Sequence, residues 1–366
     1  MKYYLLILTV LIASSCIESY NPPVIASAPS YLIVEGSIEE GTTIIKLSRS
    51  TETSSKTSLM VESDAAISIE GENGTSVALT EVSSGRYEAS NVHLDLDYKY
   101  HLKILANNGD VYESEYVNVL SAPPIDSIYW EQTSTGVDIY LNSQDPTNSI
   151  DYYKWSFAET WKFYSEYMSF YEYLGDGEMI LRTNDIFTCY KSDSSKNILI
   201  SSSKGLSQNI INRFHVTHID TDNWRLNVRY SINVKQYPLN SEAFSFYDLV
   251  RKNTETLGTF FDPQPSIIRG NITCISDQSK TAIGYVEAVV TTSKRIFIAN
   301  DELENWRGTY TCIYRNIPID SVDYYFGQLN YVPMSFDDAR NIYTGSVARC
   351  VDCTVRGDST KPEFWR

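Results

Sequence analysis

Apolar and polar residues alternate with a period of two over much of residues 31–120. Ile45 and Leu47 alternate with polar neighbours, and Tyr100, Leu102 and Ile104 do so in a later run. Turn-forming clusters of Gly, Asn and Asp separate these runs. Alternation of this kind is typical of half-buried strands, and several short strands between turns are typical of a sandwich. We therefore expect an immunoglobulin-like β-sandwich over residues 31–120.

The pattern breaks at residues 121–124, where Pro123 and Pro124 follow each other. Proline cannot donate to a strand ladder, so we place a domain boundary here. The remainder, residues 125–366, is again rich in strands, and its clearest alternating run is residues 225–235. The fold class predicted for the chain is mostly β: the N-terminal sandwich followed by a larger β-rich domain with one or two short helices.

Two segments of the second domain favour helices. Residues 241–257 have an apolar stripe at helical spacing, with Ser241 as the expected N-cap and Gly258 as the expected stop. A shorter helix is expected over residues 206–214.

The N-terminus carries a signal for export. One lysine precedes an apolar stretch that is too short to span a bilayer, and small residues then lead into Cys16. This arrangement resembles a bacterial lipobox, with Ala13 where leucine is usual. We expect residues 1–15 to be a cleaved signal peptide, Cys16 to carry lipid, and residues 16–30 to form a tether. The alternative is an ordinary signal peptide with an incidental cysteine.

The composition narrows the choice of partners. The chain of 366 residues has a formal net charge of −16 and contains 28 Tyr. Such a negative charge argues against binding nucleic acid and against docking on anionic lipid through a basic patch. We therefore expect the protein to be held at the outer membrane by its lipid alone.

Five cysteines remain after Cys16, and all of them lie in the second domain. Disulfides are expected outside the reducing cytosol, and an odd number leaves at least one cysteine unpaired. We expect Cys312 to pair with Cys350 or Cys353, and Cys189 to pair with Cys274. The CxxC at 350–353 favours a disulfide role over zinc, because no second CxxC or nearby histidine pair completes a tetrahedral site.

Candidate chemistry is sparse. Residues three apart on a strand point to opposite faces, so His215 and His218 are not expected to act together. Trp155, Trp161 and Tyr164 either line a glycan or partner surface or belong to a strand core. Nucleophile elbows, HExxH motifs and phosphate-binding glycine loops are absent from the sequence, so we expect neither catalysis nor a cofactor. The 46 acidic residues still leave room for a hydrolase site assembled from scattered carboxylates.

Several motifs resemble the Bacteroidota lipoprotein family called domain of unknown function 4249. They are Val34-Glu35-Gly36, Pro124-Ile125-Asp126-Ser127-Ile128-Tyr129, Val234-Lys235-Gln236-Tyr237, Phe246-Tyr247-Asp248-Leu249, Phe261-Asp262-Pro263-Gln264-Pro265, Gly270-Asn271-Ile272-Thr273-Cys274, Ile283-Gly284-Tyr285 and the tail from Cys350 to Trp365. The resemblance implies an outer-membrane lipoprotein, often encoded beside a TonB-dependent receptor, that presents a ligand to this transporter. The segment Phe261-Asp262-Pro263-Gln264-Pro265 is then either a rigid connecting loop or a loop that contacts ligand or partner.

The sequence leaves two points undecided: which side of the outer membrane the protein faces, and whether its serines are glycosylated. Lipoproteins of this phylum often reach the cell surface through an acidic signal just after the lipidated cysteine. Residues 17–21 contain a single acid, Glu18, which leaves exposure at the cell surface or in the periplasm undecided. Ser127, Ser321 and Ser359 lie in tripeptides that resemble the O-glycosylation pattern of the same phylum. The leading hypothesis is a non-enzymatic accessory lipoprotein in nutrient uptake. A surface adhesin that binds glycans or matrix is the alternative, and a hydrolase is the third.

Overall fold

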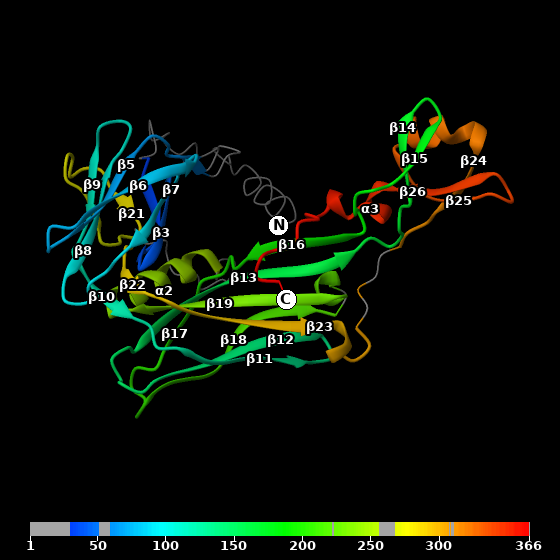
Figure 1. The fold of residues 1–366 in the computed structure, drawn as a ribbon. Helices are drawn as coiled ribbons and strands as arrows, with labels where there is room; N and C mark the ends of the chain where they lie inside the picture. The colour runs from blue at the N-terminus through cyan, green and yellow to red at the C-terminus, as the bar shows by residue number, and fades with distance from the viewer. Residues whose placement is uncertain are drawn as a thin grey trace, which may run out of the picture.

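The computed structural model describes residues 30–50, 59–221, 223–255, 268–306, 308 and 311–365. Strands make up 53% of the described residues and helices there are few and short, which confirms the mostly β fold class. The described residues form two β-sandwiches side by side and a smaller lobe that projects from the second (Figure 1).

The first sandwich is one continuous ladder wrapped around a single core. The ladder turns over at β6, which pairs with both β5 and β7. Ile45, Tyr100 and Leu102 are buried inside it, as their alternation predicts. Its N-terminal strands are β1 (Leu32–Glu35), β2 (Ile38–Glu39), β3 (Gly41–Ser50), β4 (Leu59–Val61), β5 (Ala66–Gly71), β6 (Ser76–Ser83), β7 (Arg86–Val92), β8 (Lys99–Leu105), β9 (Val111–Ser114) and β10 (Val117–Ser121).

Three strands from much later in the chain complete this sandwich. β20 (Ile272–Cys274) pairs with β9, β21 (Ala282–Ile283) runs parallel to β1, and β22 (Ala288–Val290) lies parallel to both β2 and β10. The expected division at residues 121–124 marks where the chain leaves the first sandwich, but the second part is not confined to a separate domain. Its returning strands fill edge positions that local patterns cannot reveal.

The second sandwich packs two antiparallel sheets over a core that contains Trp155, Tyr230 and Ile232. One sheet has the order β11-β12-β18 and the other has the order β16-β13-β19-β23, with β17 also on β13. The strands are β11 (Ile125–Gln132), β12 (Gly136–Asp145), β13 (Tyr152–Tyr164), β16 (Thr188–Ser194), β17 (Leu199–Ser202), β18 (Asn209–Asp220), β19 (Arg229–Leu239) and β23 (Thr292–Ala299).

The strand expected at residues 225–235 is present but displaced. It begins at Arg229, because residues 224–226 form a 3₁₀ turn that Asn223 caps. Its second face is polar, as expected, but not exposed: Ser231 is buried and Asn233 is half-buried, since β19 lies in the middle of its sheet.

One predicted helix is confirmed and the other is wrong. α2 (Ser241–Glu255) forms, but its N-cap is Asn240, whose Oδ1 accepts the backbone N–H of Ala243 at 2.7 Å. Residues 209–220 are the strand β18, because pairing with β12 outweighs local helical spacing. The expected stop at Gly258 lies outside the described residues.

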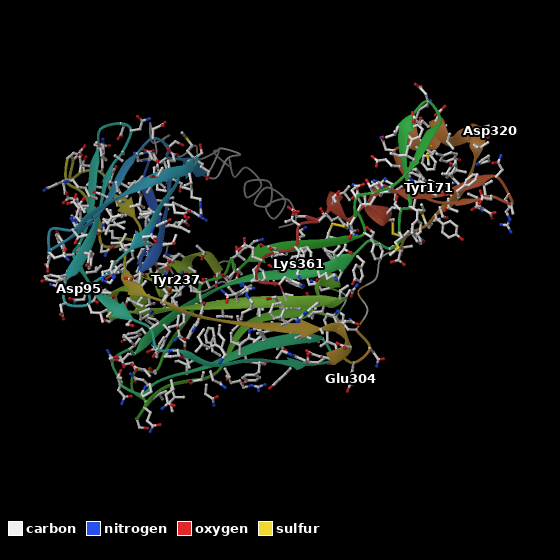
Figure 2. All side chains as sticks on the ribbon, in the orientation of Figure 1. Asp95, Tyr171, Tyr237, Glu304, Asp320 and Lys361 are labelled. Carbon is white, nitrogen blue, oxygen red and sulfur yellow. A yellow bond between two sulfur atoms is a disulfide. The ribbon has the colours of Figure 1, made fainter. Side chains whose placement is uncertain are left out.

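We call residues 166–182 and 313–347 the distal lobe. A hairpin of β14 (Tyr171–Gly175) and β15 (Glu178–Leu181) packs there against a sheet of β24 (Arg315–Pro318), β26 (Ile342–Val347) and β25 (Tyr331–Asp337). A 3₁₀ turn (Ile319–Ser321) and a π-helical turn (Asp323–Gln328) complete it. Its core is small and built largely of aromatic rings. Tyr171 and Asp320 mark this lobe in Figure 2.

Two disulfides join the distal lobe and the C-terminal tail to the second sandwich. Cys312 pairs with Cys350, one of the two expected partners. The expected pairing of Cys189 with Cys274 is wrong, because Cys189 pairs with Cys353 and Cys274 is a buried free thiol on β20 of the first sandwich. The CxxC therefore carries two separate bridges, one from Cys350 within the short helix α3 (Ala348–Val351) and one from Cys353 just after it, and its sulfurs are not available to zinc.

Candidate ligand pocket between the two sandwiches

A cavity of about 350 Å³ lies where the two sandwiches and α2 meet. Ligand pockets commonly have volumes of this order and commonly lie at domain interfaces. Its walls are mainly apolar. They are formed by Ile33, Val34, Glu35, Gly36, Lys154, Trp155, Ser156, Ser195, Asn197, Ile198, Leu199, Phe246, Tyr247, Val250, Ile283, Gly284 and Tyr285.

Two glycines in the motifs shape the wall from the first sandwich. Gly36 has φ +132°, and a Cβ there would lie 2.3 Å from the carbonyl oxygen of Ile44. Gly284 has φ +155°, and a Cβ there would lie 2.4 Å from the carbonyl oxygen of Val34. Only glycine permits both the positive φ and this approach of backbone to backbone. The glycines allow β21 to lie against β1 at the edge of the pocket.

α2 forms the opposite wall with Phe246, Tyr247 and Val250. Its first turn is anchored by Asn240, which hydrogen-bonds the Tyr285 hydroxyl at 3.2 Å. Its last turn is anchored by Glu255, whose Oε1 accepts the backbone N–H of Ile198 at 2.7 Å. Because both ends of α2 are fixed to pocket-lining residues, the cavity has a defined shape without ligand.

A polar network crosses the junction at the base of the cavity. Lys154 Nζ lies 3.4 Å from Oε1 of Glu287 and donates to the Tyr247 hydroxyl at 2.7 Å. Ser37 Oγ donates to the other oxygen of Glu287 at 3.2 Å. Only 4% of the Glu287 side chain is exposed. A carboxylate this deeply buried requires a cation, so Lys154 is essential to the junction.

A second ion pair lies beside the first, between Lys235 and Glu39. The ammonium groups of Lys154 and Lys235 lie over the ring of Tyr237, at 4.9 and 5.3 Å from its centroid. Figure 2 places Tyr237 at this junction. Both carboxylates belong to the first sandwich and both ammonium groups to the second, so the two pairs join the modules electrostatically.

The network fixes the charges at the base of the pocket. Burial opposes the charge on Lys235, but Tyr237 and Glu39 outweigh it and raise the pKa of Lys235. Burial and the charge of Glu287 raise the pKa of Tyr247 well above its usual value. At neutral pH Lys235 is therefore charged and Tyr247 is protonated, and the ammonium groups of Lys154 and Lys235 each have a carboxylate partner. The site offers an uncharged ligand an apolar cavity with a few polar groups at its base.

A second hollow, of about 470 Å³, lies along the side of the second sandwich. His215 Nε2 and His218 Nδ1 both lie near Oδ1 of Asp138, at 2.9 and 2.8 Å. The expectation that these histidines face opposite ways is wrong, because β18 bulges at Val216 and the extra residue brings both rings to one face. The described residues contain no group of three His, Cys, Asp or Glu side chains arranged to hold a metal ion.

The same hollow contains a buried ion pair. Arg225 Nη1 lies 2.6 Å from Glu159 Oε1, and the Tyr230 hydroxyl donates to the other oxygen at 2.6 Å. Glu159 is 3% exposed, so the pair stabilises the sandwich rather than presenting a free carboxylate.

The aromatic residues suggested by the sequence belong mainly to the core. Trp155 and Trp161 are buried, whereas Tyr164 is exposed and stacks on Phe187. Trp155 is nonetheless close to the cavity, and its Nε1 donates to Gln236 at 2.9 Å.

Cys16 and the segment Phe261-Asp262-Pro263-Gln264-Pro265 lie outside the described residues. The three predicted glycosylation serines differ in access. Ser359 is exposed, Ser321 is half-buried, and Ser127 is half-buried in β11, where its hydroxyl accepts a hydrogen bond from Asn142. Their modification stays a prediction, and Ser359 is the most accessible of the three. Among the described residues, no helix is both long and apolar enough to span a membrane.

Sequence reasoning missed Lys154, Glu39 and Glu287. One signal was available: Lys154 is a cation among apolar neighbours in a strand, between Tyr153 and Trp155. Their partners lie far away in the sequence. The pairings become visible only in the fold, where β20, β21 and β22 return to the first sandwich.

Fold and cavity together define a protein of paired β-sandwiches with an interdomain pocket. The chain belongs to the family described as "Domain of unknown function (DUF4249)", which matches residues 17–295. The match includes every residue that lines the pocket, and it ends before the tail from Cys350 to Trp365 that the resemblance had included.

Solved structures give remote similarities. A segment of two fibronectin type-III domains from chicken tenascin is 12% identical, covers 57% of this chain and 91% of its own, and has a TM-score of 0.17. The chicken interferon gamma receptor alpha chain is 9% identical, with coverages of 57% and 90% and a TM-score of 0.16. We draw no conclusion from scores this low. The search of curated proteins found no match.

Proposed function

We propose that this protein is a non-enzymatic lipoprotein of the outer membrane that binds a small, uncharged and mostly apolar ligand between its two sandwiches. We further propose that it assists a TonB-dependent transporter in nutrient uptake. The observation that carries the binding role is the cavity itself, which is lined by residues of three sequence motifs and bordered at its base by a charge-balanced network.

The chemistry of the walls supports an uncharged ligand. Phe246, Val250 and Ile283 offer apolar contacts, while Lys154 is already paired with Glu287. An anion would have to compete with this carboxylate, and a cation would meet the Lys154 ammonium. Burial of apolar surface contributes about 25 cal/mol per Å², which suffices for a ligand of modest size in a preformed cavity.

Two matched dyes test this binding role. N-phenyl-1-naphthylamine is uncharged and fluoresces in apolar sites, and 1-anilinonaphthalene-8-sulfonate adds a sulfonate to the same skeleton. We expect the neutral dye to bind at least tenfold more tightly than the sulfonate. Val250→Trp, which fills the cavity from α2, should abolish neutral-dye binding. Lys252→Trp on the exposed side of α2 should leave it unchanged. Equal binding by both tryptophan variants would contradict the pocket assignment.

The membrane location rests on the sequence around Cys16. Substitution Cys16→Ala should release a soluble form, because the remaining chain is too acidic to dock on anionic lipid. Fractionation of envelopes checks this, and a variant that stays fully membrane-bound contradicts lipidation.

The transport role has its own test. We expect the native lipoprotein to co-purify with a TonB-dependent receptor, and we expect deletion of its gene to slow growth on that receptor's substrate. Loss of both effects would remove the transport role while leaving the dye result intact.

A further inference from the structure

The distal lobe exposes far more apolar surface than its size requires. Nearly half of the exposed large apolar side chains in the described part of the chain belong to it. Leu181 is 68% exposed, Phe170 55%, Leu174 54% and Ile180 40%. Monomeric proteins seldom expose such groups together, and clusters of them mark interaction surfaces.

The hairpin β14–β15 arranges part of this surface into one face. Tyr171 and Tyr173 pack inward on the lobe's core. Strand alternation therefore turns Phe170 and Glu172 outward. Leu174 lies at a register shift between Tyr173 and Gly175 and is itself 54% exposed. Ile180 lies directly opposite Glu172 in the register and therefore diagonal to Phe170. We call Phe170, Leu174 and Ile180 the hairpin patch.

The charges around the hairpin patch are mainly negative. The distal lobe contains eight acidic residues, three arginines and no lysine. Glu172, beside the hairpin patch, lies 3.6 Å from Arg182, whereas Asp176 and Glu178 are exposed at the adjoining turn. At the same turn, Asp323 accepts hydrogen bonds from the Tyr173 hydroxyl and the backbone N–H of Gly177, both at 2.6 Å. The surface is therefore apolar at its centre and acidic at its rim.

We infer that the hairpin patch docks a protein partner whose contact face is apolar at its centre and rich in lysine or arginine at its edge. Charge complementarity carries this choice of occupant. A second copy of the chain would bring two acidic rims together, and an anionic membrane would repel the same rim. The inference is independent of the pocket, because the lobe lies at the far end of the second sandwich (Figure 1).

The first test uses the full-length Cys16→Ala form and a fluorescein-labelled peptide of five Lys-Leu repeats. Its alternation places leucine on one face of a strand and lysine on the other. A Glu-Leu peptide of the same length is the charge control. We expect Phe170→Ser/Ile180→Ser to weaken binding of the Lys-Leu peptide at least tenfold, although the protein's charge is unchanged. Met60→Ser/Val82→Ser, which removes two side chains of the first sandwich that are at least as exposed, should change it less than twofold.

The second test places a benzoylphenylalanine crosslinker at position 170 or 82 in the lipoprotein in its own envelope. We expect a protein adduct at 170 that is absent at 82, that diminishes with Ile180→Ser, and whose crosslinked peptide contains lysine or arginine beside apolar residues. Failure to form this adduct, or the same adduct at 82, overturns the inference.

Other results would assign the hairpin patch to a different occupant. Self-association in the ultracentrifuge that Phe170→Ser/Ile180→Ser abolishes would identify a second copy. Binding of the Cys16→Ala form to phosphatidylcholine–phosphatidylglycerol vesicles, lost in the same variant, would identify a membrane. Equal peptide binding by both double variants would show a purely electrostatic attraction. Each of these overturns the inference. All variants are exposed-site changes, and unchanged thermal unfolding confirms that they fold.

Discussion

The protein has two junctions, and they are held together by different forces. The returning strands complete the first sandwich by pairing with β1, β2 and β10, and the ion pairs Lys154–Glu287 and Lys235–Glu39 cross the interface between the two sandwiches. Where the distal lobe joins the second sandwich, which we call its neck, the disulfides Cys312–Cys350 and Cys189–Cys353 provide covalent links. The first junction encloses a cavity, whereas the second positions an exposed surface.

The size of each module explains the difference. The first two modules have large cores, so their interface is stable enough to keep a buried polar network and an unfilled cavity. The distal lobe has only a small aromatic core, and modules of that size commonly need covalent bridges. The CxxC supplies both bridges from one short segment because Cys350 and Cys353 face different partners.

The largest expected effect is the loss of a disulfide at the neck. Cys189–Cys353 closes a loop with a sequence separation of 164, against 38 for Cys312–Cys350. Loop-closure entropy predicts a loss of about 5 kcal/mol for Cys189→Ser/Cys353→Ser and about 4 kcal/mol for Cys312→Ser/Cys350→Ser. Thermal unfolding of the two double variants gives this order. The reverse order would show that the Cys312–Cys350 bridge beside the distal lobe, rather than the bridge that closes the longer loop, limits stability.

The next effect concerns the junction between the sandwiches. Lys154→Met leaves the buried Glu287 without its cation and should cost about 3 kcal/mol of unfolding free energy. Adding Glu287→Gln removes the uncompensated charge and should restore most of this loss. Denaturant unfolding of the single and double variants measures the coupling. Additive losses would contradict an ion pair that depends on both partners.

The smallest effect is the pH dependence of the histidine pair. The hydrogen bond to Asp138 raises the pKa of His218 above its ordinary 6.5. A raised pKa stabilises the fold fully below about pH 6.5, and this contribution is lost as the pH rises through the folded-state pKa. We expect Asp138→Asn to lower the pKa of His218 in an NMR titration, and to cost under about 1 kcal/mol more at pH 5.5 than at pH 8. Asp97→Asn, at an exposed residue of the first sandwich, is the control, and an unchanged His218 pKa would exclude Asp138 as the cause.

The sequence predicts the local features of this fold well. Alternation at Ile45, Tyr100 and Leu102 identifies the first core, and the helical stripe after Asn240 identifies α2. Strand pairing overrides local preference at residues 209–214, and a bulge that no periodicity reveals brings His215 and His218 together. Local patterns carry no information about either.

The pocket could be predicted only in part. Gly36, Lys235, Tyr247 and Gly284 occur in the motifs noted at the outset, but nothing in those motifs places them around one cavity. That arrangement depends on β21 returning to β1, which is a contact between residues far apart in the sequence. For the same reason only one of the two disulfides was predicted. Cys274 belongs to the returning strand β20 of the first sandwich and therefore lies far from Cys189 in the second.

The claim on which this account depends is that the cavity between the sandwiches holds a ligand. Solvent extraction of the protein purified from its native cells, followed by mass spectrometry, tests it directly, with Val250→Trp as the matched blank. We predict an uncharged, mostly apolar small molecule in the wild-type extract that is missing from the Val250→Trp extract. Identical extracts from the two proteins would contradict a ligand in the pocket.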